Sequence, residues 1–120
     1  MNIEIFRDYC LSKPMVEESF PFGGDTLVFK VMGKIFALSG IDSSPFRANL
    51  KMDPELVEEY REKYSTILPG YHMNKKHWNT VILEEDEISL KEQYWLIDHS
   101  YDQVVKSLPK KTQKELEELK

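Results

Sequence analysis

Residues with binding chemistry are most concentrated between Pro69 and Asn79. This segment contains two lysines, two histidines, two asparagines, a tyrosine and a tryptophan, and it has no acidic residue. Lysines bind phosphates, aromatic rings stack on nucleobases, and asparagine amides pair with base edges. The segment therefore indicates a nucleic-acid-binding surface. The alternative left open is structural, with Tyr71, Met73 and Trp78 anchored in the core and the lysines on a solvated loop.

Residues that enzymes use for covalent or metal chemistry are present but poorly arranged. Asp98, His99 and Ser100 are neighbours in one expected helix. Consecutive helical side chains point about 100° apart, so the three cannot line up as nucleophile, base and orienting group. His72 and His77 have no carboxylate or thiol near them in the sequence to complete a metal site. We predict a non-enzymatic protein that holds no metal and no other cofactor.

The composition is typical of one folded domain in a reducing compartment. The chain has 120 residues, of which 41% are hydrophobic, and Cys10 is its only cysteine. The sequence after Met1 lacks the charged and apolar regions of a signal peptide. No apolar stretch reaches the roughly 18 residues that cross a bilayer. We expect a single domain over residues 1–120, located in the cytoplasm, without a membrane partner.

Charge is distributed unevenly along the chain. The formal net charge of −5 argues against a nucleic-acid partner, because phosphate contacts need local positive potential. Three segments nevertheless contain lysines and no acidic residue: Thr26–Ile41, Ser65–Leu83 and Gln103–Lys114. We therefore expect one locally basic face on an acidic protein.

Three segments combine helical periodicity with a capping residue at their start. Helices are expected over residues 2–12, 53–64 and 89–108, each opened by a side chain that caps a helix, namely Asn2, Asp53 and Ser89. Pro109 ends the last of these, and Thr112 is expected to cap a short charged helix after it.

Alternating apolar residues predict strands over residues 26–31, 34–39, 46–51 and 77–83. The clearest is Phe46–Lys51, in which Phe46, Ala48 and Leu50 alternate with Arg47, Asn49 and Lys51. This pattern predicts one buried face and one exposed, polar and basic face. The order of helices and strands favours an α+β fold, with an antiparallel sheet packed against helices.

Three blocks of the sequence resemble the MmcQ/YjbR family of small bacterial proteins. They are PGYHMNKKHWNTV at Pro69–Val81, FPFG followed by DTLVFKV within Phe20–Val31, and LIDHSY followed by LPKK within Leu96–Lys111. The resemblance implies an α-β(3)-α-β(2)-α domain, similar to secretion-chaperone-like and frataxin-like sandwiches, with a further strand around Thr66–Gly70. It also implies DNA binding, because family members are commonly labelled so from their likeness to a double-wing arrangement. The family supplies no catalytic residues.

We predict a non-enzymatic protein that binds nucleic acid, with DNA as the expected partner, in a regulatory role. The cations expected to meet phosphates are Arg47, Lys51, Lys75, Lys76, Lys110 and Lys111. The residues expected to add polar contacts are Asn74, His77 and Asn79.

Two alternatives remain open from the sequence. The first is a protein- or peptide-interaction module, in which an exposed edge strand pairs with a partner strand or with a second copy to form a homodimer. The second is a small-ligand or catalytic site in a polar pocket lined by Tyr71, His72, Asn74 and His77.

Overall fold

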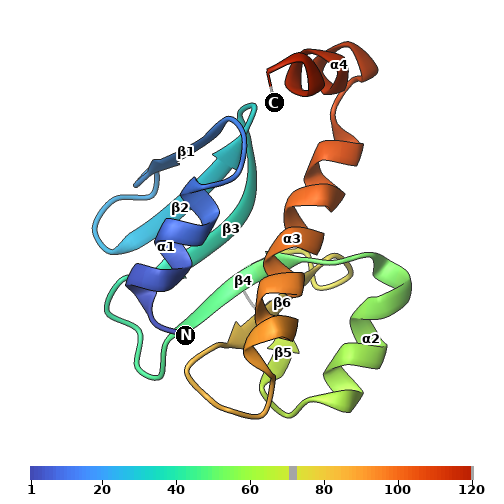
Figure 1. Ribbon diagram of the computed structural model, residues 1–120. Coiled ribbons are helices and arrows are strands. Elements are labelled where there is room, and N and C mark those ends of the chain that lie inside the picture. Colours follow the sequence, from blue (N-terminus) through green and yellow to red (C-terminus); the bar gives the residue numbers. More distant parts are fainter. Residues whose placement is uncertain (71–72, 120) are drawn as a thin grey trace.

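The computed structural model describes residues 1–70 and 73–119, so Tyr71, His72 and Lys120 lie outside the described residues. The described residues form four helices and six strands (Figure 1). In chain order these are α1 (Ile3–Leu11), β1 (Val16–Ser19), β2 (Thr26–Val31), β3 (Lys34–Gly40), β4 (Arg47–Lys51), α2 (Pro54–Lys63), β5 (Ile67–Pro69), β6 (Trp78–Ile82), α3 (Leu90–Ser107) and α4 (Lys110–Glu118).

All the strands belong to one sheet with the order β1-β2-β3-β4-β6-β5, and every neighbouring pair is antiparallel. The α+β fold with an antiparallel sheet is therefore confirmed, as is the strand expected around Thr66–Gly70. A β-bulge between Phe29 and Lys30 shifts the β2–β3 register. At this bulge Phe36 is the extra residue on β3, between the partners of Phe29 and Lys30. Phe36 and Ala37 therefore both reach the main core although they are consecutive.

The main core lies on one face of the sheet, where α1 and α3 lie side by side (Figure 1). Phe6 of α1 packs edge-on against Phe29 and Phe46, with ring centroids 5.7 and 5.5 Å apart. The apolar stripe of α3 joins the same core through its buried Leu96, Ile97, Tyr101 and Val104. A second, smaller cluster on the opposite face consists of Val28, Leu38 and Trp78, with Ile35 and Met73 beside it. No residue of a described helix belongs to that cluster, so within residues 1–70 and 73–119 no helix covers it, and this side is referred to below as the open face of the sheet.

Strand β1 is absent from the sequence-based prediction, so β1–β4 replace the three strands expected before α2. Its residues pair with β2 from Val16 opposite Val31 to Ser19 opposite Val28. Two consecutive glutamates give the segment low strand propensity, which hid it from pattern reasoning. In the folded chain, pairing with β2 and an ion pair to α1 offset this low propensity. In the ion pair, Arg7 Nε donates to Glu18 Oε1 at 2.8 Å.

The C-terminal helix also differs from the prediction. It begins at Lys110, directly after Pro109, and no side chain caps its first turn, so the proposed cap at Thr112 is wrong. Burial of Leu116 in the main core fixes this helix instead. Within residues 1–70 and 73–119, no helix combines the length and the apolar character that spanning a membrane requires.

Gly70 allows the chain after β5 to pass unusually close to β6. A Cβ atom at this position would lie 3.0 Å from the carbonyl oxygen of Trp78 and 3.1 Å from its Cβ. The Gly70 amide also donates to that carbonyl, at 3.1 Å, so the two backbones cannot separate without losing a hydrogen bond.

We expect Gly70→Ala to destabilise the protein by about 1–3 kcal/mol, as overpacking does, and to lower Tm by about 4 °C per kcal/mol. Thermal unfolding followed by circular dichroism measures the change. Gly40→Ala is the matched control, because a Cβ there would meet Ser43 Cβ at an ordinary 3.7 Å. Equal Tm values for the two variants would contradict the close-approach argument.

Candidate functional site

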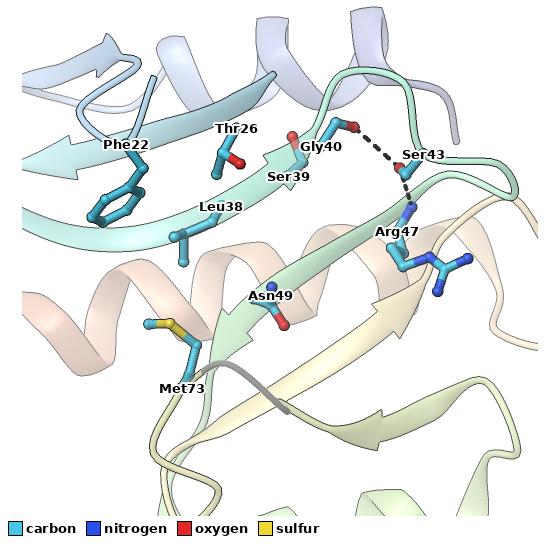
Figure 2. A pocket seen from close by; sticks show the side chains of 9 residues that line it. All are labelled: Phe22, Thr26, Leu38, Ser39, Gly40, Ser43, Arg47, Asn49 and Met73. Carbon is cyan, nitrogen blue, oxygen red and sulfur yellow. Dashed lines mark hydrogen bonds between the residues drawn. The ribbon is translucent and has the colours of Figure 1, made fainter. Parts of the chain in front are cut away.

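The open face of the sheet carries a hollow of about 490 Å³, shown from close by in Figure 2. Strands β2, β3 and β4 form its floor, and the loops before β2 and β6 form its sides. Its lining residues are Phe22, Thr26, Leu38, Ser39, Gly40, Ser43, Arg47, Asn49 and Met73. This volume is within the usual range for small-molecule sites, about 300–1,000 Å³.

Apolar side chains make up one side of the hollow. Leu38 rises from β3, and Met73 faces it from the loop before β6 (Figure 2). Phe22, in the loop between β1 and β2, is 67% exposed, which is high for a phenylalanine. An exposed aromatic ring beside an apolar hollow is typical of a contact surface rather than of a core.

Polar groups come from β4 and from the loop before it. Ser43 Oγ donates to the Gly40 carbonyl at 3.1 Å and accepts from the Arg47 amide at 3.4 Å, which holds the β3–β4 connection closed. Asn49 Oδ1 accepts a hydrogen bond from Thr80 Oγ1 at 2.6 Å. The Asn49 amide nitrogen has no hydrogen-bond partner among the described residues, and in Figure 2 it points toward Leu38.

Arg47 and Lys51 lie on the open face of β4, as the alternation in Phe46–Lys51 predicted. Arg47 is exposed, and among the described residues its guanidinium hydrogen-bonds only to the Pro45 carbonyl, at 3.5 Å. The ion pairs Arg7–Glu18 and Lys13–Asp98 of the described part of the chain involve neither of these two residues. Both cations on β4 are therefore without an acidic partner there.

The other predicted contact residues are divided between two places. Lys75 and Lys76 lie on the exposed turn before β6 and line a smaller hollow with Pro54, Val57, Glu58 and Arg61. Lys110 and Lys111 open α4 rather than following the last helix, and α4 lies far from the first residues of β4 (Figure 1). The structure does not bring Arg47 and Lys110 together on one basic face.

Two polar residues of the turn, Asn74 and His77, have local structural contacts. Asn74 accepts the amides of His77 and Trp78 with its carbonyl and the amide of Lys76 with its side chain, so it shapes the turn. The His77 carbonyl accepts the Met52 amide at 2.8 Å, and the residue is half-buried.

Asn79 is a correction to the predicted contact set. It is 2% exposed and faces the core side of β6, so it is not placed to contact a ligand. Its Oδ1 accepts a hydrogen bond from Arg61 Nε at 2.7 Å, and Arg61 also donates to the carbonyls of Lys75 and Trp78. The sequence analysis did not select Arg61, because an arginine in a run of glutamates is usually solvent-exposed. In the structure, Arg61 of α2 binds the turn before β6 through these hydrogen bonds.

The comparisons with known proteins agree on one family. The YjbR family model matches residues 11–103. The chain belongs to the YjbR family. It is 44% identical to "Uncharacterized protein YbdF" of Escherichia coli O157:H7 over 114 residues, or 92% of this chain and 90% of that protein. It is 35% identical to "Uncharacterized protein YjbR" of Escherichia coli K12 over 120 residues, or 99% and 100% of the two chains.

Solved structures show the same fold. The crystal structure of Deinococcus radiodurans protein DR2400, described as a DUF419 domain, superposes with a TM-score of 0.88 at 40% identity. The match covers 96% of this chain and 87% of that one. A Pseudomonas syringae protein solved by crystallography matches with a TM-score of 0.71 at 35% identity, over 83% and 96% of the two chains.

The block Leu96–Tyr101 of this YjbR-family chain holds the fold together. Asp98 accepts hydrogen bonds from Tyr9 and Lys13, which ties α3 to α1 and the turn that follows it. His99 Nε2 accepts the Asp53 amide at 3.1 Å, and its ring stacks on Trp95 at 4.7 Å. Asp98, His99 and Ser100 thus contact different elements.

Ser100 bridges β3 and β4. Its hydroxyl accepts the Lys51 amide at 2.8 Å and donates to the Phe36 carbonyl.

Among the residues described, no group of three or more His, Cys, Asp and Glu side chains could hold a metal ion, and His72 lies outside them. Burial raises the pKa of the Cys10 thiol, so this cysteine is held in its neutral form.

We expect Ser100→Ala to destabilise the protein by about 2–4 kcal/mol, because it leaves one backbone donor and one acceptor unpaired. Urea unfolding measures the change. Ser107→Ala is the matched control in the same helix, since that hydroxyl only donates to the Val104 carbonyl of its own helix. A change within about 0.5 kcal/mol for both variants would refute a bridging role.

We also expect a pH dependence from His99. Burial lowers the pKa of His99 below its ordinary value, although the nearby Asp53 carboxylate opposes the shift. The unfolded chain therefore binds the proton more tightly than the folded protein does. The stability that the neutral His99 contributes is fully present above the ordinary histidine pKa of about 6.5, and it is lost as pH falls below that value toward the lower pKa of the folded protein. Urea midpoints from pH 7.5 to 5.5 should fall less for His99→Gln than for the unchanged protein; parallel curves would contradict the assignment.

Proposed function

We propose that this protein binds single-stranded nucleic acid on the open face of its sheet. The observation that carries the proposal is the meeting, on one face, of an exposed aromatic ring with two cations that have no acidic partner among the described residues. These are Phe22, Arg47 and Lys51. Single-strand-binding surfaces combine the same two components, a basic path for the backbone and aromatic platforms for the bases.

The two cations suit a short stretch of backbone. Arg47 and Lys51 are four residues apart on one strand, so their Cα atoms are about 13 Å apart along it, on the same face. Asn49 lies between them on that face, beside Leu38 of the neighbouring strand. A nucleic-acid strand that follows β4 would therefore meet Arg47 in the hollow and Lys51 farther along β4, with a base between the two phosphates.

The geometry favours a small contact over a long basic track. Lys110 and Lys111 are remote from β4, and Lys75 and Lys76 line a hollow against α2. A chain with a net charge of −5 repels nucleic acid at long range, so binding depends on a few local contacts. A hollow with apolar side chains on one side also suits an unstacked base better than the outside of a duplex.

We expect the salt dependence of binding to correspond to two phosphate contacts. For single strands, log Kobs changes against log salt concentration with a slope of about −0.7 per contact, which gives about −1.4 here. Arg47→Ala and Lys51→Ala should each reduce this slope to about −0.7. Fluorescence anisotropy with a labelled single-stranded oligonucleotide, titrated at several salt concentrations, measures it.

The matched control is Lys110→Ala/Lys111→Ala, which removes two charges from the start of α4 and should leave the slope at its original value. If the α4 double variant and the β4 variants reduced the salt slope equally, the oligonucleotide would be attracted by net charge alone and not by contacts on β4. An oligonucleotide that fails to bind at low salt, together with a protein partner retained by pull-down, would favour the peptide-interaction alternative.

A further inference from the structure

We propose that the hollow on the open face is also a binding site for a small aromatic carboxylate, and that this ligand competes with nucleic acid for Arg47. Three features of the hollow support the proposal: apolar side chains gathered at one end, a single cation at the other, and no acidic side chain among the described residues that line it. The competition rests on the proposed function, whereas the binding of the carboxylate does not.

The apolar end of the hollow suits a flat ring. Met73 packs against the small cluster that contains Leu38, and Figure 2 shows Phe22 on the same side of the hollow. A methionine side chain is flexible, so Met73 can adapt to the shape of a ring and contact it through sulfur. Phe22 is 67% exposed, and a ligand ring that covers it removes apolar surface of both rings from water.

The charged end of the hollow lies farther along β4. Asn49 is the register partner of Leu38, and Arg47 lies two residues before Asn49 on the same face, about 7 Å away along the strand. In Figure 2, Arg47 is accordingly separated from the apolar side chains, with Asn49 between them. A ligand that contacts both ends therefore needs an apolar body of one or two rings with its charge at one end.

The charge that Arg47 can accept is a single negative one. Among the described residues its guanidinium hydrogen-bonds only to the Pro45 carbonyl, through Nε at 3.5 Å, so the terminal N–H groups can bind a carboxylate in a bidentate pair. Asp25 and Asp42 lie in the neighbouring loops, but neither lines the hollow. Lys51 is not among the lining residues either, so a dianion would bring one uncompensated charge beside apolar side chains.

The same reasoning predicts competition with nucleic acid. A phosphodiester group is also a monoanion, and the proposed function assigns one such group to Arg47. A carboxylate bound to this guanidinium, with its ring over Leu38, occupies the place of that phosphate and of the neighbouring base. A small acid would thereby regulate access of nucleic acid to the open face.

The test uses 2-naphthoate as the probe, because it has two fused rings and one carboxylate. Titration followed by two-dimensional 1H–15N NMR gives the affinity and the location together, and we expect saturable shifts at the amides of Leu38, Arg47 and Asn49. The neutral isostere 2-naphthalenemethanol should bind about tenfold more weakly, the lower end of what a hydrogen bond to a charged group contributes.

Two variants of β4 separate the hollow from general attraction by charge. Arg47→Ala removes an exposed side chain, and it should weaken 2-naphthoate about tenfold while leaving the affinity for the alcohol unchanged. Lys51→Ala is the matched control: it removes the same charge from the same strand outside the hollow, so it should leave 2-naphthoate binding unchanged while weakening the oligonucleotide. Saturating 2-naphthoate should also displace a labelled single-stranded oligonucleotide in fluorescence anisotropy.

An aromatic carboxylate also occurs at the C-terminus of a peptide that ends in phenylalanine. A short acetylated peptide of this kind should bind more weakly than 2-naphthoate. Tighter binding of the peptide would assign the hollow to protein C-termini and overturn the proposal of a small free acid.

No saturable binding of 2-naphthoate, equal affinity for the acid and the alcohol, or equal losses from Arg47→Ala and Lys51→Ala would overturn the carboxylate site. If 2-naphthoate bound without displacing the oligonucleotide, the competition would be wrong. If 2-naphthoate bound as expected and no oligonucleotide bound at low salt, the proposed function and the competition would both be overturned, and the carboxylate site would stand.

Discussion

Packing of α3 against β3 and β4 is the interaction on which the rest of the structure depends. Leu96, Ile97, Tyr101 and Val104 are buried there, and burial of side chains of this size contributes about 1.5–3 kcal/mol each. The same helix inserts the Ser100 hydroxyl between the two strands. Because α1 also lies on this side, the main core occupies one face of the sheet. The other face of the sheet carries the small cluster around Leu38, and no described helix covers it.

Local sequence rules account for most of this fold. Asn2, Asp53 and Ser89 cap their helices as predicted, because a capping side chain needs only neighbouring amides. Alternation also identified the exposed face of β4 correctly. Strand β1 was missed because its stability comes from pairing with β2 and from the contact of Arg7 with Glu18, both of which require the folded chain. The same holds for α4, which is fixed by the burial of Leu116.

The candidate site was less predictable, because its members come from distant parts of the chain. Phe22, Leu38 and Met73 meet only when three separate segments fold together, and no local pattern relates them. Asn79 shows a different failure. Its position two residues before the core residue Val81 placed it on the buried face, but its polar type suggested exposure. The alternation rule was the better guide, since Arg61 satisfies the buried amide.

The described residues of the segment Pro69–Val81 make structural contacts that its composition did not suggest. Gly70 permits close approach to β6, and Arg61 holds the carbonyls of the turn. The Met73 amide donates to the Gly70 carbonyl at 3.0 Å, which sets Met73 opposite Leu38. Among its described residues, Gly70, Met73 and Asn74 thus shape the turn before β6. In the proposed function, phosphate contact falls to Arg47 and Lys51 of β4. A defect at Gly70 or Arg61 would then alter binding through the shape of the turn, without touching either contact residue.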